Sequence, residues 1–243
     1  MASNEAISAT HYLYVNHDYV LRSYKTMSYS DFKTLEQINT ELGIVIKDEN
    51  KLYVNIEPVK LSNLFVEIMK VAFDLAIKID TEMARQSFIV DNVLMELKRH
   101  IDISFFVGNA FNVDKSKGLT GNPDSIITNS DNQLYITSPV VILVEAKKSD
   151  LGGGYAQCIA EMEAARIFNE RKANNIPIIY GVVTDGVIWR FISLHDNIAV
   201  IDSYLYNFGD GSKILGILKY FLQNSHNSVG SVITDPTDIS PSI

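Results

Sequence analysis

The sequence contains a single cysteine, Cys158, among its 243 residues. One thiol cannot form an intrachain disulfide, and it excludes the cysteine-rich sites that hold structural zinc. We expect Cys158 to be a small buried residue on a helix. No apolar run approaches the length of about 20 residues that a membrane-spanning helix requires. Met1–Thr10 lack the basic start and apolar core of a signal peptide, so we expect a cytoplasmic protein that has no membrane partner.

Basic residues are also scarce. The chain has 21 Lys and Arg against 29 Asp and Glu, which gives a formal net charge of −8. It therefore lacks the broad positive field by which unaided DNA-binding proteins attract the phosphate backbone. This argues against tight nonspecific DNA binding and leaves open a local basic track. The nearest basic cluster either contacts phosphates or is a solvated charge run, and it consists of Lys98, Arg99, His100, Lys115 and Lys117.

The motifs of several large enzyme classes are absent. The sequence has no P-loop, no Gly-x-Ser-x-Gly, no His-Glu-x-x-His, and no GxGxxG between a strand and a helix. No internal repeat is present. The composition, with 47% hydrophobic and 21% charged residues, is that of an ordinary globular protein. The length suffices for one large domain or two small ones.

The first 60 residues predict an α+β extension. A helical pattern begins at Ser30-Asp31, and Gly43 ends it. Two apolar segments, Ile44–Ile46 and Leu52–Ile56, predict strands around a turn. We assign no chemistry to this part of the chain.

Two helices are expected next. Ser62 is placed to cap a helix over Leu64–Ile79, and Thr81-Glu82 begins a second helical run through about Lys98. In the first helix we expect the core-facing side to be the apolar stripe with helical spacing, which consists of Leu64, Ile68, Val71, Leu75 and Ile79. In the second run the core candidates are Phe88, Val93, Leu94 and Leu97.

The most informative stretch follows a first core strand expected over Ile103–Val107. The run Val140–Val144 is short, β-branched and uninterrupted, which predicts a strand buried on both faces. It ends in Glu145-Ala146-Lys147, and charged groups at the end of a buried strand need partners because unpaired charges are costly away from water. Since alternate strand residues share a face, Glu145 and Lys147 point to one side and Ala146 to the other.

Asp124 begins the preceding predicted strand, Asp124–Thr128, and comes beside Glu145 if the two strands pair. Two close carboxylates repel and raise each other's pKa unless a cation lies between them. Such oxygen ligands suit Mg²⁺ or Mn²⁺, and a neighbouring Lys147 could orient water or offset charge on a phosphate. The alternative is that Asp124 merely starts a strand and that Glu145–Lys148 are solvated residues at a strand end.

The rest of the chain predicts further α/β elements. A glycine-rich break at Gly152–Gly154 precedes a helix over Tyr155–Asn174, and Gln157 lies near its start. Asp185-Gly186 is a strong hairpin signal between two apolar runs. The expected strands and final helix are Ile178–Thr184, Val187–Ile192, Val200–Tyr206 and Ser212–Asn224. Polar residues dominate from Ser225 onward and predict a flexible tail over 225–243.

This arrangement resembles the PD-(D/E)XK nuclease superfamily, with Pro123-Asp124 and Glu145-Ala146-Lys147 as the two halves of its motif. The resemblance implies that Asp124 and Glu145 bind a divalent metal, Mg²⁺ or Mn²⁺, with the Ala146 carbonyl as a third ligand. It also implies that Lys147 is the catalytic lysine. Gln157 matches a glutamine that many members carry on the following helix. The tyrosine often found four residues later is replaced by Glu161, so the helix departs from the family pattern at this position.

In the same family an acidic residue often lies near the start of the helix before the first core strand. Glu82 fits that place, and Glu96 is the second candidate. For Glu82 the alternative is a charge that complements the helix dipole. The turn Thr184–Gly186 followed by Trp189 is similar to the nuclease domains of type I restriction enzyme motor subunits, which adds support for the fold.

The expected fold class is therefore α/β: a restriction-endonuclease-like core with a mixed central sheet of at least four strands flanked by helices. The expected domains are an N-terminal α+β extension over 1–60, a nuclease-like domain over 61–224 and the tail. The expected function is metal-dependent hydrolysis of phosphodiester bonds in nucleic acid, with DNA as the substrate. One alternative is a nuclease-like subunit of little activity that binds a partner protein. The other is a plain structural domain. Cleavage of both DNA strands would favour a homodimer.

Overall fold

A computed structural model describes residues 27–147 and 151–225, so residues 226–243 of the expected tail and the first 26 residues of the expected extension lie outside it. The helical elements are η1 (Tyr29–Asp31), α2 (Leu35–Leu42), α3 (Asn63–Ile79), α4 (Glu82–Arg85), η2 (Gln86–Val90), α5 (Asp91–His100), η3 (Lys115–Lys117), α6 (Leu151–Arg171), η4 (Phe208–Asp210) and α7 (Gly211–Asn224). The strands are β1 (Val45–Glu49), β2 (Ser104–Val107), β3 (Ser125–Thr128), β4 (Val140–Ala146), β5 (Ile178–Thr184), β6 (Ile188–His195), β7 (Ile198–Asp202) and β8 (Tyr206–Asn207).

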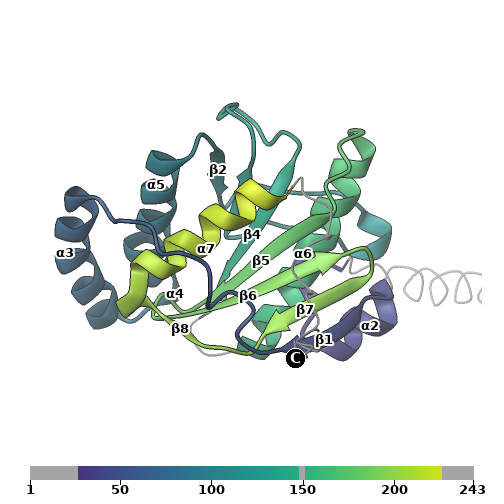
Figure 1. The fold of residues 1–243 in the computed structure, drawn as a ribbon. Helices are drawn as coiled ribbons and strands as arrows, with labels where there is room; N and C mark the ends of the chain where they lie inside the picture. The colour runs from purple at the N-terminus through teal and green to yellow at the C-terminus, as the bar shows by residue number, and fades with distance from the viewer. Residues whose placement is uncertain (1–26, 148–150, 226–243) are drawn as a thin grey trace, which may run out of the picture.

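All eight strands belong to one mixed sheet, in the order β1-β7-β6-β5-β4-β3-β2, with β8 paired to β6. The strands β2, β3 and β4 form an antiparallel meander, and β5 then pairs parallel to β4 after the crossover helix α6. Figure 1 shows α7 lying across one face of the sheet and α6 on the other. The chain thus has the expected α/β fold, with a mixed sheet flanked by helices.

The two faces of the sheet are packed differently. On the α7 side, Phe221 stacks on Tyr180 of β5, with ring centroids 3.9 Å apart, and meets Tyr53 and Phe191 edge-on. On the α6 side, the neighbouring Gly181 lies under Met162, where a Cβ would come within 2.5 Å of Sδ. Every residue of β4 is buried, as its uninterrupted apolar run predicts.

Helix α6 begins earlier than expected. The segment Gly152–Gly154 is helical rather than a break before the helix. A Cβ at Gly154 would lie 2.9 Å from Val183 Cγ1 and 3.0 Å from Lys147 Cγ, so the glycine lets the first turn of α6 approach the ends of β4 and β5. The glycines therefore serve close packing here, and the sequence pattern alone could equally signal a turn.

Asp202 explains two further departures from the expected strands. Its buried carboxylate accepts hydrogen bonds from Lys51 N at 2.9 Å and from the hydroxyl of Tyr206 at 2.7 Å. The segment Leu52–Ile56, expected as a strand, instead turns, and Lys51 adopts a left-handed conformation with φ of 65°. The expected strand Val200–Tyr206 likewise divides at Asp202 into β7 and β8.

The described part of the expected N-terminal extension is built into the core. Strand β1 pairs parallel with β7 at the edge of the sheet, and Tyr53 joins the aromatic cluster beneath α7. Helix α2 is capped by Thr34, four residues after Ser30, and ends at Gly43 in the left-handed conformation, as that glycine predicts. Residues 27–60 thus share one sheet and one hydrophobic core with the rest of the described chain.

Helix α3 begins where Ser62 predicts, since the Ser62 hydroxyl accepts a hydrogen bond from Phe65 N at 3.1 Å. The expected packing face is wrong. The side that packs on α4, η2 and α5 consists of Phe65, Met69, Ala72 and Ala76. The stripe expected in the core is exposed, with Val71 at 70% of its maximum accessible area and Leu64 at 53%.

The helical run after Thr81 is continuous from α4 through η2, a π-helical turn, into α5. Val93, Leu94 and Leu97 are buried as predicted, and Phe88 packs partly buried against the core. Among the described residues, no helix combines the length and the apolar character that crossing a bilayer would demand.

We predict that Gly216→Ala destabilises the protein, although alanine is the better helix former by about 1 kcal/mol. A Cβ at Gly216 of α7 would lie 2.3 Å from the carbonyl oxygen of Glu57, which is backbone and cannot rotate away. The free energy of unfolding should fall by about 1–3 kcal/mol in urea titration. In the matched control Gly211→Ala, the nearest atoms lie 3.8 Å from the Cβ, so stability should be unchanged or higher. Equal effects of the two substitutions would contradict this packing.

Candidate active site at the end of strand β4

The pairing of β3 with β4 brings the two halves of the predicted motif together. Ser125 lies opposite Val144, so the preceding residue, Asp124, comes next to Glu145 at the end of the ladder. The Asp124 carboxylate accepts a hydrogen bond from the backbone N–H of Ala146 at 2.7 Å. Asp124 thus lies beside Glu145, as the sequence predicts if the two strands pair, and the antiparallel register accounts for it.

Lys147 connects the buried and exposed parts of the cluster. Its Nζ lies 2.6 Å from Glu145 Oε1 and 3.6 Å from Glu82 Oε1. Glu145 is fully buried, whereas the side chains of Lys147 and Glu82 are 24% and 50% exposed. The cluster thus runs from the interior of the sheet to the solvent.

Glu161 is a member of the cluster that the sequence pattern did not assign. It lies one turn after Gln157 on α6, is fully buried, and its Oε1 accepts a hydrogen bond from Gln157 Nε2 at 3.2 Å. Its carboxyl group also contacts that of Glu145. The sequence signal was present as an acid at the position where the resembled family often has tyrosine. Whether Glu161 belongs to the cluster depends on which face of α6 turns toward β4.

The carboxyl groups shift one another's ionisation. Burial, together with the charge of Asp124, raises the pKa of Glu145 to about 7. Burial and the charge of Glu145 raise the pKa of Glu161 well above its usual range, and burial also raises that of Asp124. Burial lowers the pKa of Lys147, but its acidic neighbours outweigh this, so the pKa rises overall and the group stays an ammonium ion.

Three carboxylate oxygens in the cluster have no hydrogen-bond partner among the described residues: both oxygens of Glu145, of which Oε1 is in ion-pair contact with Lys147, and Oε2 of Glu161. When Glu145 and Glu161 are both ionised, their oxygens can only accept hydrogen bonds, so the contact between the two carboxylates is repulsive. It becomes favourable when one group carries a proton and donates it to the other. The cluster is therefore short of positive charge or of protons at its buried end.

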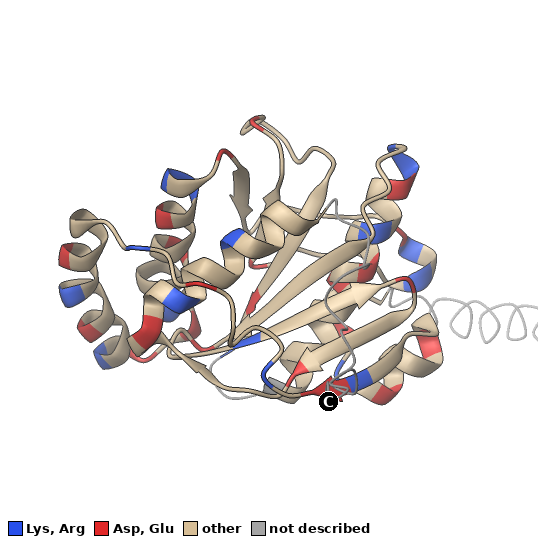
Figure 2. Ribbon diagram, viewed as in Figure 1, with Lys and Arg blue, Asp and Glu red and all other residues tan. Residues whose placement is uncertain are grey.

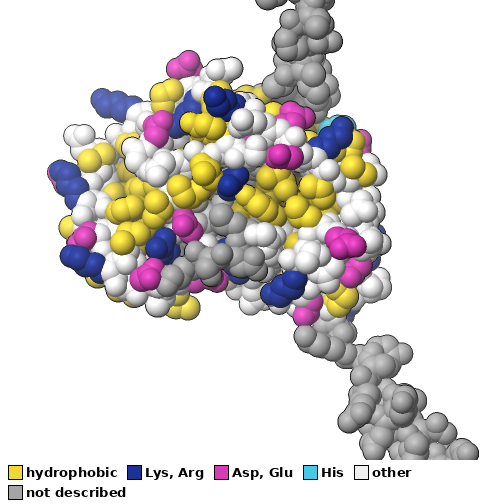
Figure 3. Space-filling model, turned by 90° about the horizontal axis from the view of Figure 1, so that it is seen from below, with side chains coloured by type: hydrophobic (Ala, Val, Ile, Leu, Met, Phe, Trp, Pro, Cys, Tyr) yellow, Lys and Arg dark blue, Asp and Glu magenta, His cyan; other side chains and the backbone are white. Residues whose placement is uncertain are grey.

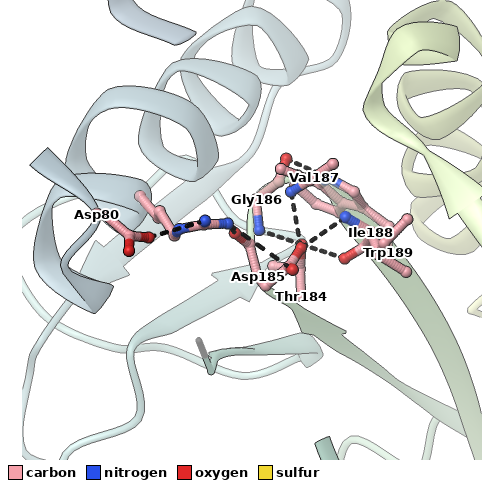
Figure 4. Close-up of polar contacts among 8 residues, drawn as sticks. Asp80, Thr184, Asp185, Gly186, Val187, Ile188 and Trp189 are labelled. Atoms are coloured by element: carbon pink, nitrogen blue, oxygen red, sulfur yellow. Dashed lines mark hydrogen bonds and ion pairs between the residues drawn. The ribbon is translucent and has the colours of Figure 1, made fainter. Parts of the chain in front are cut away.

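Glu82 is held in place by a link between α4 and the β5–β6 turn. Arg85, three residues after Glu82, donates from Nη1 to the carbonyl oxygen of Asp185 at 2.8 Å. Its Nη2 lies 3.1 Å from Asp80 Oδ1 (Figure 4). The start of α4 is thus joined to the turn whose Thr184 carbonyl accepts a hydrogen bond from Lys147 N at 2.8 Å.

Hydrogen bonds within the β5–β6 turn stabilise its conformation. Asp185 Oδ1 accepts from the N–H groups of Val187 and Ile188 at 2.8 and 2.6 Å, and Trp189 Nε1 donates to the Gly186 carbonyl at 3.2 Å (Figure 4). Gly186 has φ of 84°, a conformation that favours glycine. The Asp-Gly pair therefore forms the predicted hairpin, and Trp189 is a fully buried packing residue.

The π-helical turn η2 contacts Ser125, the residue that follows Asp124. In η2, Gln86 is turned inward, and its Nε2 donates to Asp91 Oδ1 at 2.8 Å and to Ser125 Oγ at 3.0 Å. Such turns insert one residue into a helix and recur at functional sites. This network joins the helices to the residue that follows Asp124, and no sequence signal predicted it.

Glu96, the second candidate for the helix acid, lies elsewhere. Its carboxylate accepts from Ser62 N at 2.7 Å and from Ser62 Oγ at 2.9 Å, which ties α5 to the start of α3. These bonds and the neighbouring His100 lower its pKa, although burial opposes the shift. Of the two candidates, only Glu82 contacts Lys147.

The expected basic cluster does not flank the site as a unit. Lys98, Arg99 and His100 end α5 next to the start of β2, where Ser104 pairs with Thr128. That is the opposite end of β3 from Asp124. Lys98 and Arg99 are also engaged by the Ile103 carbonyl and by Glu96.

No family model and no curated protein matches this chain. Within residues 27–147 and 151–225, no three His, Cys, Asp or Glu side chains form a preassembled metal-binding group. The site is instead a cluster of carboxylates around one ammonium group.

We predict an unusual pH dependence of stability that comes from Glu145. Its folded pKa of about 7 exceeds the ordinary value of 4.5, so between these pH values the folded protein binds more protons than the unfolded chain. The stabilising contribution of protonated Glu145 is complete below pH 4.5 and is lost as the pH rises through 7. The expected loss in the free energy of unfolding is about 1–3 kcal/mol.

The measurement is urea unfolding in EDTA at several pH values for wild type, Glu145→Gln and the control Glu170→Gln. Glu170 lies on the same helix as Glu161 but is half exposed and pairs with Arg166. The difference between wild type and Glu145→Gln should change with pH across this window, and that between wild type and Glu170→Gln should stay constant. A constant difference for Glu145→Gln would show that this carboxyl has an ordinary pKa.

Proposed function

We propose that the chain is a Mg²⁺-dependent phosphodiesterase that cleaves nucleic acid, with DNA as the expected substrate and a restriction-endonuclease-like core. The observation that carries the proposal is the meeting of Asp124, Glu145 and Lys147 at the end of the fully buried strand β4. The order of elements adds support. A helix, the antiparallel meander β2–β4, the helix α6 with Gln157, and the parallel strand β5 follow the arrangement that the resemblance to PD-(D/E)XK nucleases implies.

The residues at this site fit a divalent cation by their donor chemistry. Carboxylate oxygens are the ligands that Mg²⁺ and Mn²⁺ prefer, and the unpartnered oxygens of Glu145 and Glu161 are buried acceptors. Asp124 and Glu145 would hold the cation, with the Ala146 carbonyl as the third group implied by the resemblance. When bound, a divalent cation supplies a Lewis acid and lowers the pKa of a coordinated water.

Each remaining residue has a role that its contacts support. Lys147 keeps its proton at neutral pH, so it acts as a fixed positive charge that orients water or offsets charge on the phosphate, and not as a base. Glu82 lies beside this ammonium group at the solvent-exposed end and positions it. Gln157 holds Glu161 by a hydrogen bond and so supports the buried end.

The second candidate is a nuclease-like subunit that has little activity of its own and works in a complex. The formal net charge of −8 favours it, because the chain lacks a positive field that would draw DNA to the site unaided. The two candidates differ in one measurable respect. Only the first expects cleavage by the isolated protein.

The test incubates purified protein with plasmid, linear and branched DNA in Mg²⁺, Mn²⁺ or EDTA. We expect cleavage with either cation and none in EDTA. Asp124→Ala and Lys147→Ala should each reduce the rate by a factor on the order of 10²–10³. Mg²⁺ titration by calorimetry separates the roles, because Asp124→Ala should lose the heat of binding and Lys147→Ala should retain it.

Glu170→Gln is the control and should cleave like wild type, since Glu170 belongs to the far end of α6. Cleavage that survives Asp124→Ala or Lys147→Ala would overturn the assignment. Folded protein that binds Mg²⁺ without cleaving any of the substrates would favour the inactive-subunit alternative.

A separate prediction concerns Glu161. If its buried carboxylate supports cation binding, Glu161→Gln should weaken Mg²⁺ affinity by a factor of about 10 while leaving a measurable site. Calorimetry measures this directly, without reference to cleavage. Removal of a buried repulsion should also make the metal-free variant more stable than wild type at pH 8, which urea unfolding measures. Unchanged affinity would assign Glu161 to the packing of α6 alone.

A further inference from the structure

Within the part of the chain that the structure describes, helix α3 exposes more apolar surface than its packing contacts cover. One side, with Phe65, Met69, Ala72 and Ala76, packs on the neighbouring helices. A second apolar stripe is exposed to solvent, with accessible fractions between 40% and 70%, and consists of Leu64, Ile68, Val71, Leu75 and Ile79. A helix that is apolar on most of its circumference is normally covered.

The location of α3 leaves the stripe free to meet another molecule. Figure 1 shows α3 at the outer edge of the fold, beyond α5 and α4 and on the far side from α2. Figure 3, which keeps α3 at the left, shows hydrophobic side chains exposed among charged ones on this part of the surface. Contiguous exposed apolar surface of this kind marks interaction sites.

The spacing of the stripe is that of a helix that pairs with another helix. Leu64, Ile68, Val71 and Leu75 follow one another at intervals of four, three and four residues. This is the alternation of the a and d positions in a coiled coil, where side chains of one helix fit between those of the facing helix. The stripe therefore fits a helix, and a second α3 offers the same surface.

The charges beside the stripe make it complementary to itself. Along the helix, the charged residues alternate in sign, beginning with minus and ending with plus: Glu67, Lys70, Asp74 and Lys78 (Figure 2). When two copies run antiparallel, Glu67 comes opposite Lys78 toward the ends of the pair and Lys70 opposite Asp74 near its centre, and the two-fold symmetry makes each pairing occur twice. The charged face has no excess of basic residues, so it does not fit an anionic membrane surface.

We propose that α3 forms the two-fold interface of a homodimer, in which the stripe Leu64–Ile79 packs antiparallel against the same stripe of a second copy. The proposal does not depend on nuclease activity, because none of the motif residues belongs to α3. Since Glu82 follows α3 closely, the two active-site clusters lie at opposite ends of a helix pair about 25 Å long.

The first test is sedimentation equilibrium of the full chain, loaded at a concentration on the order of 100 µM. We expect a mass of twice 27.2 kDa for wild type. Val71→Glu should raise the dimer dissociation constant by a factor of about 100 or more, because it places like charges near the two-fold axis. Val71 is 70% exposed, so the fold should persist, and circular dichroism checks this.

Leu134→Glu is the matched control, since Leu134 is 91% exposed and lies outside α3. It should leave the mass at the dimer value. A monomeric wild type overturns the proposal and leaves the stripe to a different protein or to another segment of this chain. A dimer that Val71→Glu does not weaken also overturns it, because the interface would then lie elsewhere.

The second test determines the direction of pairing. The native Cys158 is buried, so a new surface cysteine can be oxidised selectively. In the antiparallel pair, Val71→Cys near the centre should form an intermolecular disulfide, and Leu64→Cys at the end should not. Crosslinking of both variants would indicate parallel helices and overturn the antiparallel pairing. Crosslinking of neither would also contradict it.

Discussion

The burial of Glu145 at the end of β4 is the constraint on which the site depends. A fully buried carboxylate is costly unless it is paired, protonated or bound to a cation. Here the ammonium group of Lys147 contacts one oxygen, and burial shifts the pKa of the carboxyl to about 7. The carboxyl group also contacts a second buried acid, Glu161, and neither of its oxygens has a hydrogen-bond partner among the described residues. The fold thus maintains an incompletely compensated charge at one defined place.

The surrounding elements position the side chains of the cluster around Glu145. Gly154 allows the first turn of α6 to reach Lys147, and a side chain there would push the helix away from β4. Arg85, the last residue of α4, joins this one-turn helix to the β5–β6 turn, and Glu82 at its first position lies beside the same lysine. Two backbone N–H groups anchor the cluster: that of Ala146 donates to the Asp124 carboxylate, and that of Lys147 donates to the Thr184 carbonyl. Much of the local geometry therefore serves a few charged atoms.

The sequence predicted the parts of this arrangement that follow from period and register. The uninterrupted run before Glu145 indicated a buried strand, and strand pairing then placed Asp124 beside it. The parts that depend on tertiary packing were not predictable. Glu161 became a member of the cluster only because of the rotation of α6 about its axis. Gly152–Gly154 could signal a break or a close approach, and the approach was decided by Val183 and Lys147.

Helix α3 shows the same limit in another form. Its sequence contains two apolar stripes about a quarter-turn apart, and periodicity cannot say which one faces the core. The stripe with the larger side chains was expected to be inside. The chain instead buries the side that carries Ala72 and Ala76, which allows α3 to approach α4 and η2 closely. The stripe that was chosen for its hydrophobicity is therefore an exposed surface of α3, and the side with the small residues makes the core contact.

The acidic character of the chain bears on how the proposed function would work. Among the described residues, the cluster consists of four acids, Asp124, Glu145, Glu161 and Glu82, and the ammonium group of Lys147, so it carries −3 when every group is ionised. A phosphate approaching that charge is repelled, and the main run of basic residues on α5 lies at the other end of β3. One divalent cation would bring the local charge from −3 to −1, and a second would make it positive. Under the proposed function, cation binding would therefore come before substrate binding. The acidic residues that would repel a phosphate from the metal-free site are the same residues that would bind the divalent cation.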